Sequence, residues 1–532
     1  MKKPNIVSSL VKGALLTLLL TAPLLALMAL AQQMLGVPFI PFDVFDLLTR
    51  ILPGSVITTG IDSMVGVITA LGLSVADTAK LAEQAMAVGL TLALAMIGGA
   101  VFFVWQRSGR SSLRTGLIYG LIIGVLLAVV SATRQGASFI DGLWVFLALG
   151  VWGLGLAWLQ RRLAQPSTEP ASAERLNRRQ FVVRVGGAAA LITVAGAGVG
   201  AALGRRNAAL TAAAEGERWS ATNALPNADA VVGVVDGTRP EYTPLEQYYR
   251  IDINLTPPAV QEADWRLRVE GLVDTPKEYT LAELRAYDPV HQFITMACIS
   301  NPVGGELTST TRWTGVPLKR LLGEWGLQDT ATHLRITSAD GFFEYIATED
   351  IQNDERIMLA YEWDGVPLHA RHGFPLRVYI PDLYGMKQPK WIESIEAVDA
   401  WAPGYWVQRT WDKTAQIRAT SVIDTVATNM MLGTAQAGEE MAIPIGGMTH
   451  AGARGIQSVE VQVDSGEWQQ AELREPMSEL TWVLWRFDWP FEPGEHTFTV
   501  RCTDGNDETQ ITDRRPPHPS GATGLNNEQV ML

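Results

Sequence analysis

The stretch TMACISNPVGGELTSTTRWTGVPLKRLL, Thr295 to Leu322, decides how the rest of this chain is interpreted. It holds Cys298, one of only two cysteines in 532 residues, in a loop of Ser, Asn, Pro and Gly. The preceding HQFITMAC predicts a buried strand, and Gly-Val-Pro opens a predicted helix. A zinc site needs three or four such ligands and a disulfide frame needs paired cysteines. A lone thiolate at a strand end is either a core residue or one soft ligand to a metal held mainly by a cofactor.

Two blocks of the sequence resemble the molybdenum-cofactor domain of the sulfite oxidase family. The first is C-x-S-N-P-V-G-G followed by R-W-x-G-V-P-L, and the second is HGFPLRVYIPDLYGMKQPKWIESIE, His372 to Glu396. The resemblance spans roughly Tyr242 to Asp513. It implies a molybdenum–molybdopterin cofactor, in which Cys298 and a pterin dithiolene hold the metal.

The resemblance also implies which side chains surround that cofactor. The cofactor-binding candidates are Tyr249, Arg250, Thr337 (with Ser338 as the alternative), His372, Arg377, Gln388, Pro389 and Lys390. The catalytic candidates are Cys298, Arg250 and Tyr345, the last as a phenol beside the metal. A buried phosphate dianion needs fixed cations, which a rigid Arg and a Lys supply. Without the resemblance, Arg250 and Lys390 are interpreted as surface cations and His372 as a satisfied buried histidine.

The N-terminal part of the chain has the composition of a membrane protein. Residues 1–205 carry 16 Lys/Arg against 8 Asp/Glu, whereas residues 206–532 carry 26 against 47. Apolar runs long enough to span a bilayer cover Leu10–Ala31, Ala82–Trp105, Gly116–Ala132 and Phe139–Leu159. The shorter FDVFDLLTRILP, Phe42 to Pro53, predicts an interfacial amphipathic segment. The acidic second part argues against nucleic acid as a partner.

Positive charges predict that the N-terminus and the end of the fourth span face the cytoplasm. A fifth span, Phe181 to Leu203, then carries the chain out. Just before it, the sequence NRRQFVV around Arg178 and Arg179 resembles a twin-arginine export signal; the alternative is two ordinary positive-inside arginines. Ala212–Ala214 is a candidate cleavage site. The predicted localisation is the cell membrane, multi-pass, with the catalytic domain on the extracytoplasmic side.

The chain is therefore predicted to be multidomain: an α-helical transmembrane bundle, an α+β molybdopterin domain, and an immunoglobulin-like β-sandwich. Alternating residues such as SVEVQV, followed by the hairpin turn Asp-Ser-Gly, predict the sandwich, with Cys502 in its core. The expected boundaries are 1–160 for four spans, 161–204 for the cytoplasmic loop and fifth helix, 205–242 for a linker, 243–405 for the molybdopterin domain, 406–515 for a dimerising sandwich, and 516–532 for an irregular tail.

The resemblance implies oxygen-atom transfer, and the substrate stays open. Sulfite and nitrate members follow their cysteine with a basic pair, whereas Ile299, Ser300, Asn301 and Pro302 follow it here, so a neutral sulfoxide is the alternative substrate. All seven histidines lie beyond residue 290, which predicts no haem in the membrane part. Electrons then need an external carrier, a cytochrome or a membrane redox protein. Membrane lipid and a second copy of the chain are the other expected partners. A membrane-tethered binding scaffold without catalysis is the alternative from another class.

Overall fold

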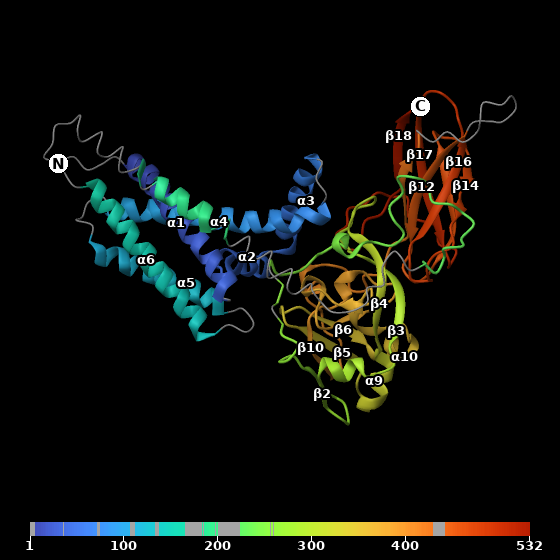
Figure 1. Cartoon of the computed structure of the whole chain (residues 1–532), viewed down its shortest axis with the longest axis horizontal. Coiled ribbons are helices and arrows are strands. Elements are labelled where there is room, and N and C mark those ends of the chain that lie inside the picture. The colour runs from blue at the N-terminus through green and yellow to red at the C-terminus, as the bar shows by residue number, and fades with distance from the viewer. Residues whose placement is uncertain are drawn as a thin grey trace. The chain divides into compact units, whose positions relative to one another are not determined.

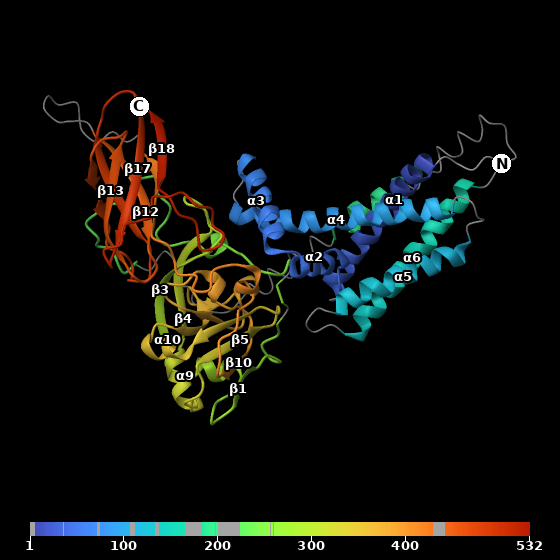
Figure 2. The same ribbon diagram turned by 180° about the vertical axis from the view of Figure 1, so that it is seen from behind.

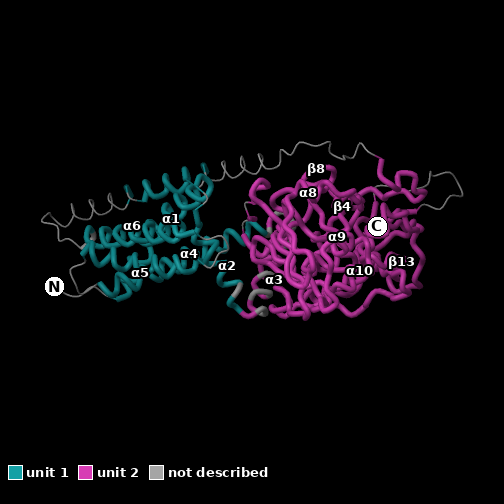
Figure 3. The backbone as a smooth tube through the Cα atoms, turned by 90° about the horizontal axis from the view of Figure 1, so that it is seen from below, with its two compact units in different colours: residues 1–52, 80–213 teal, residues 53–79, 214–532 magenta. Residues whose placement is uncertain are grey.

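The computed structural model describes residues 6–35, 37–71, 75–106, 112–132, 138–164, 183–184, 186–196, 198–199, 224–255, 257–258, 260–428 and 442–532. The twin-arginine-like motif at Arg178 and Arg179, the cleavage candidate Ala212–Ala214 and most of the expected linker lie outside the described residues. The chain divides into two compact units, residues 1–52 with 80–213 and residues 53–79 with 214–532 (Figure 3).

The first unit is helical, as its apolar runs predict. Its helices are α1 (Ile6–Leu35), α2 (Ile40–Ile51), α4 (Val75–Trp105, from Lys80 onward), α5 (Leu113–Ala132) and α6 (Phe139–Ala164) (Figure 1). Among the described residues, four helical segments are long and apolar enough to cross a membrane: Ile6–Leu35, Lys80–Trp105, Leu113–Ala132 and Phe139–Arg162. The four predicted spans are thus confirmed as apolar helices. A shorter apolar helix, Gly186–Gly196, lies within the predicted fifth span.

Small residues allow these helices to approach one another closely. A Cβ atom on Gly120 of α5 would overlap Leu149 O of α6, and a Cβ atom on Gly153 of α6 would overlap Gly116 O of α5. A Cβ atom on Gly99 of α4 would likewise overlap Thr17 of α1. Polar side chains add interhelical hydrogen bonds, such as Trp152 Nε1 to Thr21 Oγ1 at 3.0 Å. Close backbone packing of this kind replaces the hydrophobic driving force that lipid removes.

The short helix α2 is consistent with a segment that does not span. It begins after Phe39 with proline in its first turn, where the missing N–H costs no intrahelical bond. Its 12 residues extend about 18 Å, well below the roughly 30 Å of a hydrocarbon core. In the second unit, α3 (Gly54–Ala70) is a further helix of 17 residues.

The middle of the second unit contains two five-stranded sheets. The first has the order β2-β1-β10-β5-β6, in which only the β1–β10 pair is parallel: β1 (Leu267–Gly271), β2 (Lys277–Tyr279), β5 (His333–Ser338), β6 (Phe343–Ala347), β10 (Ile392–Val398). The second has the order β3-β4-β7-β8 with β9 beside β7: β3 (Val290–Ala297), β4 (Thr308–Pro317), β7 (Met358–Trp363), β8 (Val366–Pro367), β9 (Arg377–Tyr379).

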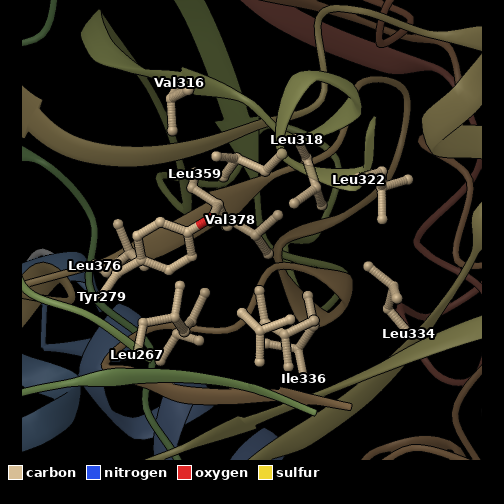
Figure 4. Packing of buried hydrophobic residues seen from close by; sticks show 14 of the residues in the cluster. Leu267, Tyr279, Val316, Leu318, Leu322, Leu334, Ile336, Leu359, Leu376 and Val378 are labelled. Carbon is tan, nitrogen blue, oxygen red and sulfur yellow. The ribbon is translucent and has the colours of Figure 1, made fainter. Parts of the chain in front are cut away.

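Short helices connect and cover these sheets: α8 (Leu281–Arg285), α9 (Leu318–Trp325) and α10 (Thr348–Asn353), with the 3-10 turns η2 (Leu245–Gln247), η3 (Ala370–His372), η4 (Gly385–Lys387) and η5 (Val407–Arg409). Thr280 and Glu283 form a capping box that starts α8, and Gly326 in the left-handed region ends α9. Apolar side chains from the first sheet, α9, β7 and β9 meet in one core, which includes Leu267, Ile336, Leu322, Leu359 and Val378 (Figure 4).

The C-terminal part of the second unit is a sandwich of two four-stranded antiparallel sheets (Figures 1 and 2). The orders are β11-β12-β16-β15 and β14-β13-β17-β18: β11 (Thr420–Val426), β12 (Ala442–His450), β13 (Ile456–Val463), β14 (Trp468–Gln470), β15 (Glu472–Leu473), β16 (Val483–Pro490), β17 (Glu495–Asp504), β18 (Asn526–Met531). The core lies between the sheets and includes Cys502, as predicted. The immunoglobulin-like identity of the sandwich stays a prediction.

The segment expected to be an irregular tail ends in a strand. Asn526–Met531 forms β18, which pairs along β17 from Val500↔Asn526 to Glu495↔Met531. Its sequence NNEQVM is polar and short, so it carries no alternating apolar signal; an edge strand exposed on one face needs none. The residues before it lie close to Tyr384 and Arg418, because Ser520 O accepts a hydrogen bond from Arg418 and a Cβ atom on Gly521 would overlap Tyr384.

Candidate active site

Cys298 follows strand β3 in a loop that hydrogen bonds hold rigid. Its N–H donates to Leu307 O (2.9 Å), and its carbonyl accepts from Asn301 N (3.0 Å). The Asn301 side chain closes the loop, since Oδ1 accepts from Leu307 N (2.9 Å) and Nδ2 donates to Thr308 Oγ1 (3.1 Å). Gly304 has φ +82°, and a Cβ atom on Gly305 would overlap Asn301. The Ser-Asn-Pro and Gly-Gly composition is therefore required by the loop itself.

The Cys298 thiol is buried, with 8% of the residue exposed, and it forms no disulfide. Its sulfur lies 3.0 Å from Ser300 Oγ. Burial raises the pKa of the thiol, and the Ser300 hydrogen bonds and the positive charge of Lys390 partly oppose that shift. The phenols of Tyr249 and Tyr384 lie close enough for a charge on Cys298 to raise their pKa values. The sulfur is thus a sheltered soft donor with a cation nearby.

Three predicted cofactor residues converge on a buried charged cluster, which we define as Arg250, Asp252, Arg377 and Lys390. Arg250 Nε donates to Asp252 Oδ2 at 2.5 Å, and Lys390 Nζ pairs with Asp252 Oδ1 and donates to Ile251 O at 2.9 Å. The Asp252 side chain has no exposed surface. Burial lowers the pKa of Lys390 despite this pairing, and Arg377 and Arg250 lower it further by repulsion.

Aromatic rings surround Arg377 of this cluster and its neighbour His372. The guanidinium of Arg377 lies over the Trp313 ring at 4.7 Å, and its Nη1 donates to His372 O at 3.1 Å. The imidazole of His372 packs against Trp363 and Tyr248, with ring centroids 4.6 and 5.7 Å away. Burial, followed by the charge of Lys390, lowers the pKa of His372 well below its ordinary value. His372 is therefore neutral at physiological pH.

The Tyr248–Tyr249 pair extends this set of aromatic rings toward Cys298. The two rings stack with centroids 5.7 Å apart and an interplanar angle of 18°. Tyr249 N donates to Ser309 Oγ on β4 (3.1 Å). The sequence prediction included Tyr249 but not Tyr248, whose hydroxyl is buried without a partner among the described residues.

The remaining predicted cofactor residues line the same region to different degrees. Gln388 is buried, and its Nε2 donates to Leu383 O (2.8 Å) while its Oε1 has no partner among the described residues. Pro389 O accepts from Val378 N on β9. Thr337 is half-buried on β5, paired with Phe343 and Ser394. The alternative Ser338 is fully buried, and its Oγ likewise lacks a described partner.

Tyr345 lies elsewhere. It occupies β6, the edge strand of the first sheet, where its ring meets Phe343 edge-to-face (6.4 Å) and its N–H donates to Glu344 Oε1 (2.9 Å). None of the contacts described for Tyr345 connects it to Cys298 or to the charged cluster. Its neighbour Glu344 faces inward instead, and pairs with buried Lys387 at 3.2 Å.

Sequence reasoning missed Asp252, Asp340 and Lys387. Asp252 had a local signal, because a carboxylate two residues after a candidate buried arginine is well placed to pair with it. Asp340 lies in the β5–β6 turn beside the cluster, and burial raises its pKa to about 6. Only the fold shows that Lys387 is buried against Glu344, since these residues are far apart in sequence.

The charged cluster contains more positive than negative charge. Asp252 is the carboxylate that Arg250 and Lys390 share, and Arg377 adds a third cation. Arg250 Nη2 is buried without a partner among the described residues. Burying uncompensated charge is costly, so this arrangement suits a bound anionic group. Among the described residues, no group of three or more His, Cys, Asp and Glu side chains could hold a metal ion, so a metal at Cys298 needs ligands from a cofactor.

Comparison with known proteins identifies the domain. Residues 254–406 match the family model described as "Oxidoreductase molybdopterin binding domain". Chicken (Gallus gallus) sulfite oxidase is 28% identical over 297 residues, 47% of this chain and 64% of that protein. A putative protein-methionine-sulfoxide reductase subunit, YedZ1, of Azospira oryzae is 30% identical over 147 residues, 28% of this chain and 54% of that protein. The chain thus spans about half to two thirds of these relatives' lengths.

A solved structure, the sulfane dehydrogenase SoxCD from Paracoccus pantotrophus, is also similar to this chain. Its TM-score is 0.48 at 20% identity, covering 56% of this chain and 82% of that one. The predicted residues from Cys298 to Lys390 lie inside the matched range 254–406, whereas Tyr249 and Arg250 lie just before it.

Proposed function

This chain belongs to the sulfite oxidase family of molybdopterin-dependent oxidoreductases, and from that premise we propose that it is a membrane-anchored enzyme of oxygen-atom transfer. The observation that carries the proposal is the position of Cys298. Its sheltered sulfur lies at the end of β3, within electrostatic reach of a buried cluster that has excess positive charge. A thiolate next to an anion-binding slot is what a molybdenum–molybdopterin group requires.

Different residues of this chain would bind different parts of the molybdenum–molybdopterin group. Cys298 would supply the protein's sulfur ligand. Arg250, Arg377 and Lys390 would neutralise the phosphate and pterin, and Tyr249, His372, Gln388 and Pro389 would line the slot, with Thr337 or Ser338 at its β5 side. When bound, the cofactor supplies two-electron oxygen-atom-transfer chemistry. The protein groups position it, exclude water and tune its charge.

Rigidity is the main contribution of the protein. Hydrogen bonds from Asn301 to Leu307 and Thr308 hold the two sides of the Cys298 loop together. A ligand on a preorganised loop loses less entropy on binding a metal than a ligand on a mobile one. The neutral imidazole of His372 can donate or accept one hydrogen bond without adding to the positive charge already present.

A sulfoxide reductase is the second candidate. The printed name of the Azospira oryzae relative supports it, as does the absence of basic residues directly after Cys298. A non-catalytic, membrane-tethered scaffold is the alternative outside enzymology. We further propose that the catalytic part lies outside the cytoplasm, that an external cytochrome or membrane redox protein exchanges its electrons, and that the sandwich forms a homodimer.

Metal analysis of the full chain tests the proposal. The intact protein, purified in mild detergent, is expected to contain about one molybdenum per chain. A Cys298→Ser variant should lose at least about 100-fold in activity toward whichever of sulfite, sulfoxides or nitrate the wild type uses, because its metal loses a thiolate. X-ray absorption at the molybdenum edge should show one fewer sulfur neighbour in any metal that this variant retains.

Cys502→Ser is the matched control, because Cys502 is also buried but lies in the sandwich core. That variant should keep its metal, its sulfur neighbours and its activity. A wild-type protein without molybdenum would refute the oxidoreductase proposal and favour the scaffold. A Cys298→Ser protein with normal turnover would refute the role of this sulfur.

A further inference from the structure

A pocket opens beside the Cys298 loop, and no member of the charged cluster lines it. Its space amounts to about 440 Å³ when open solvent is included, and only about 30 Å³ of this accepts the centre of a water-sized molecule. One wall is the loop itself, from Asn301 to Gly305, together with Ala297 and Thr308. The other lining residues are Tyr384 and side chains from the sandwich and the segments that lead to it. Cys298 itself does not line the pocket, but Tyr384 does, and that phenol lies close enough to Cys298 for a charge on the sulfur to raise its pKa. A ligand in this pocket would therefore lie near the proposed metal position.

His450 provides an unsatisfied polar atom to this pocket. It is the last residue of β12, only 4% of it is exposed, and its Nε2 has no partner among the described residues. Such a buried nitrogen costs free energy unless something binds it. Burial lowers the pKa of His450 to about 3, with a smaller contribution from Arg454, so the imidazole is a neutral hydrogen-bonding group.

Arg418 is the cation of the pocket. Its Nε donates to Ser520 O at 3.2 Å, and its backbone N–H donates to Tyr384 Oη at 3.1 Å. Among the described residues, its Nη groups form no hydrogen bond. The nearby carboxylate of Asp412 is occupied by Ser520, Thr414 and Ala415, and offsets part of the guanidinium charge without pairing with it. The pocket therefore offers at most one net positive charge.

The other pocket side chains from the sandwich side are mostly apolar. Ile417, Val422, Met448 and Ala522 line this wall, alongside the hydroxyl of Thr420. Gly521 has φ +91°, and a Cβ atom there would be 2.6 Å from Tyr384 Oη. The backbone at Gly521 is therefore in close contact with the Tyr384 phenol. A lining that combines a cation, a neutral imidazole and apolar side chains is suited to a ligand with an oxygen-bearing head and an apolar substituent.

We propose that His450 and Arg418 make this pocket the substrate-recognition site, selective for small oxo compounds with one negative charge and an apolar substituent. Arg418 pairs with the charge, His450 Nε2 hydrogen-bonds an oxygen, and the Ile417–Met448 wall holds the substituent. A dianion would leave one charge uncompensated, and a neutral compound would leave Arg418 without a counter-ion. That the bound compound is a substrate rests on the proposed function.

Three tetrahedral sulfur compounds of similar size test the charge preference: sulfate, methanesulfonate and dimethyl sulfone. We expect titration calorimetry with the full, metal-loaded chain to show methanesulfonate binding at least about 10-fold tighter than either of the others. Arg418→Gln should remove the preference of methanesulfonate over dimethyl sulfone. His450→Phe should weaken methanesulfonate about 10-fold, and His450→Gln, which keeps a hydrogen-bonding group, should restore most of that loss.

Matched controls come from the same domain but outside the pocket. Arg501→Gln and His496→Gln alter side chains on β17 that pair with Glu460 and Asp464, and both should leave all three affinities unchanged. Unchanged molybdenum content and circular dichroism in the pocket variants would show that each one folds.

The outcomes separate this inference from the function it rests on. Tightest binding of sulfate, equal binding of all three probes, or no binding by metal-loaded protein would overturn the inference and leave the enzyme proposal standing. Selective methanesulfonate binding that depends on Arg418 and His450 would support it. The same selectivity in a chain that never carries molybdenum would retain the pocket as a ligand site and refute its role in catalysis.

Discussion

Asp252 compensates the positive charges of the charged cluster and so stabilises it. Its side chain is fully buried and contacts both Arg250 and Lys390. Removing one partner from a buried ion pair leaves an uncompensated charge, whose desolvation is no longer offset. The three cations Arg250, Arg377 and Lys390 would then repel one another in a low-dielectric slot. An anion bound to the slot would replace part of the missing negative charge.

Replacing Asp252 by Asn should therefore destabilise the cofactor-free protein by about 3 kcal/mol. The loss should be smaller in cofactor-loaded protein, because the phosphate then compensates the cations. Thermal unfolding of both forms measures the difference. Asp488→Asn is the control, since Asp488 pairs with Arg486 at the surface, where ion pairs contribute less than about 1 kcal/mol. Equal effects of the two substitutions would contradict the assigned role of Asp252.

His450 predicts a pH dependence of stability. Its pKa is about 3 in the folded chain against an ordinary value of 6.5, so the unfolded chain takes up the proton first as pH falls. The contribution of His450 to stability is thus fully present above pH 6.5 and is lost progressively between about 6.5 and 3. The unfolding temperature of wild-type protein should fall more steeply over this range than that of His450→Phe. Superimposable slopes would show that His450 is not buried as a neutral group.

At the scale of elements, the contact between α5 and α6 depends on how closely their backbones approach. Gly116 and Gly120 on α5 face Gly153 on α6, and each would overlap the opposite backbone if it carried a side chain. Lipid does not drive apolar helices together, so dispersion contacts between close backbones carry the association. Gly142, also on α6, meets nothing closer than Ala128 Cβ at 3.9 Å.

Gly153→Val is expected to weaken the α5–α6 pair by about 3 kcal/mol, because the added methyl groups push the two backbones apart. Loss of helical circular dichroism during titration with a denaturing detergent measures the change. Gly142→Val, in the same helix but away from the contact, should unfold at the wild-type detergent fraction. A variant at Gly153 that unfolds no earlier than the Gly142 variant would contradict this packing.

At the same scale, most elements could be predicted from the sequence, whereas the C-terminal strand could not. The strand before Cys298, the helix after Pro317, and the Asp464 turn of the sandwich follow from local alternation, capping and turn residues. Strand β18 could not be predicted, because a polar edge strand is specified by its pairing with β17 rather than by its own sequence. The role of Tyr345 beside the metal stays a prediction; the structure places this residue on β6, the edge strand of the first sheet.

The distribution of charge predicts the topology of the whole molecule. Arginines concentrate in the loops on one side of the spans, which predicts that the N-terminus and the end of α6 lie in the cytoplasm. An alkaline phosphatase reporter fused after Ala164 should be inactive, and the same reporter after Leu532 should be active, because that enzyme folds only outside the cytoplasm. The same activity at both sites would contradict the fifth crossing.

Exchange of Arg178 and Arg179 for lysine separates the two interpretations of that pair. Lysine keeps the positive charge, so positive-inside orientation should not change. The receptor for a twin-arginine signal recognises the arginines themselves. If the pair is such a signal, the reporter fused after Leu532 should stay in the cytoplasm in the double lysine variant.

The sequence by itself determined which residues could bind the cofactor and which segments could cross the membrane. Both depend on patterns within a few dozen residues: a strand, a glycine-rich loop and a thiol, or an apolar run with its flanking arginines. Only the tertiary structure decided the character of the neighbouring pocket. The residues after Cys298 contain no cation, which on sequence alone disfavours an anion, yet the fold supplies Arg418 and His450 from more than 100 positions away. The physical reason is that packing the sandwich against the Cys298 loop joins side chains that share no local pattern.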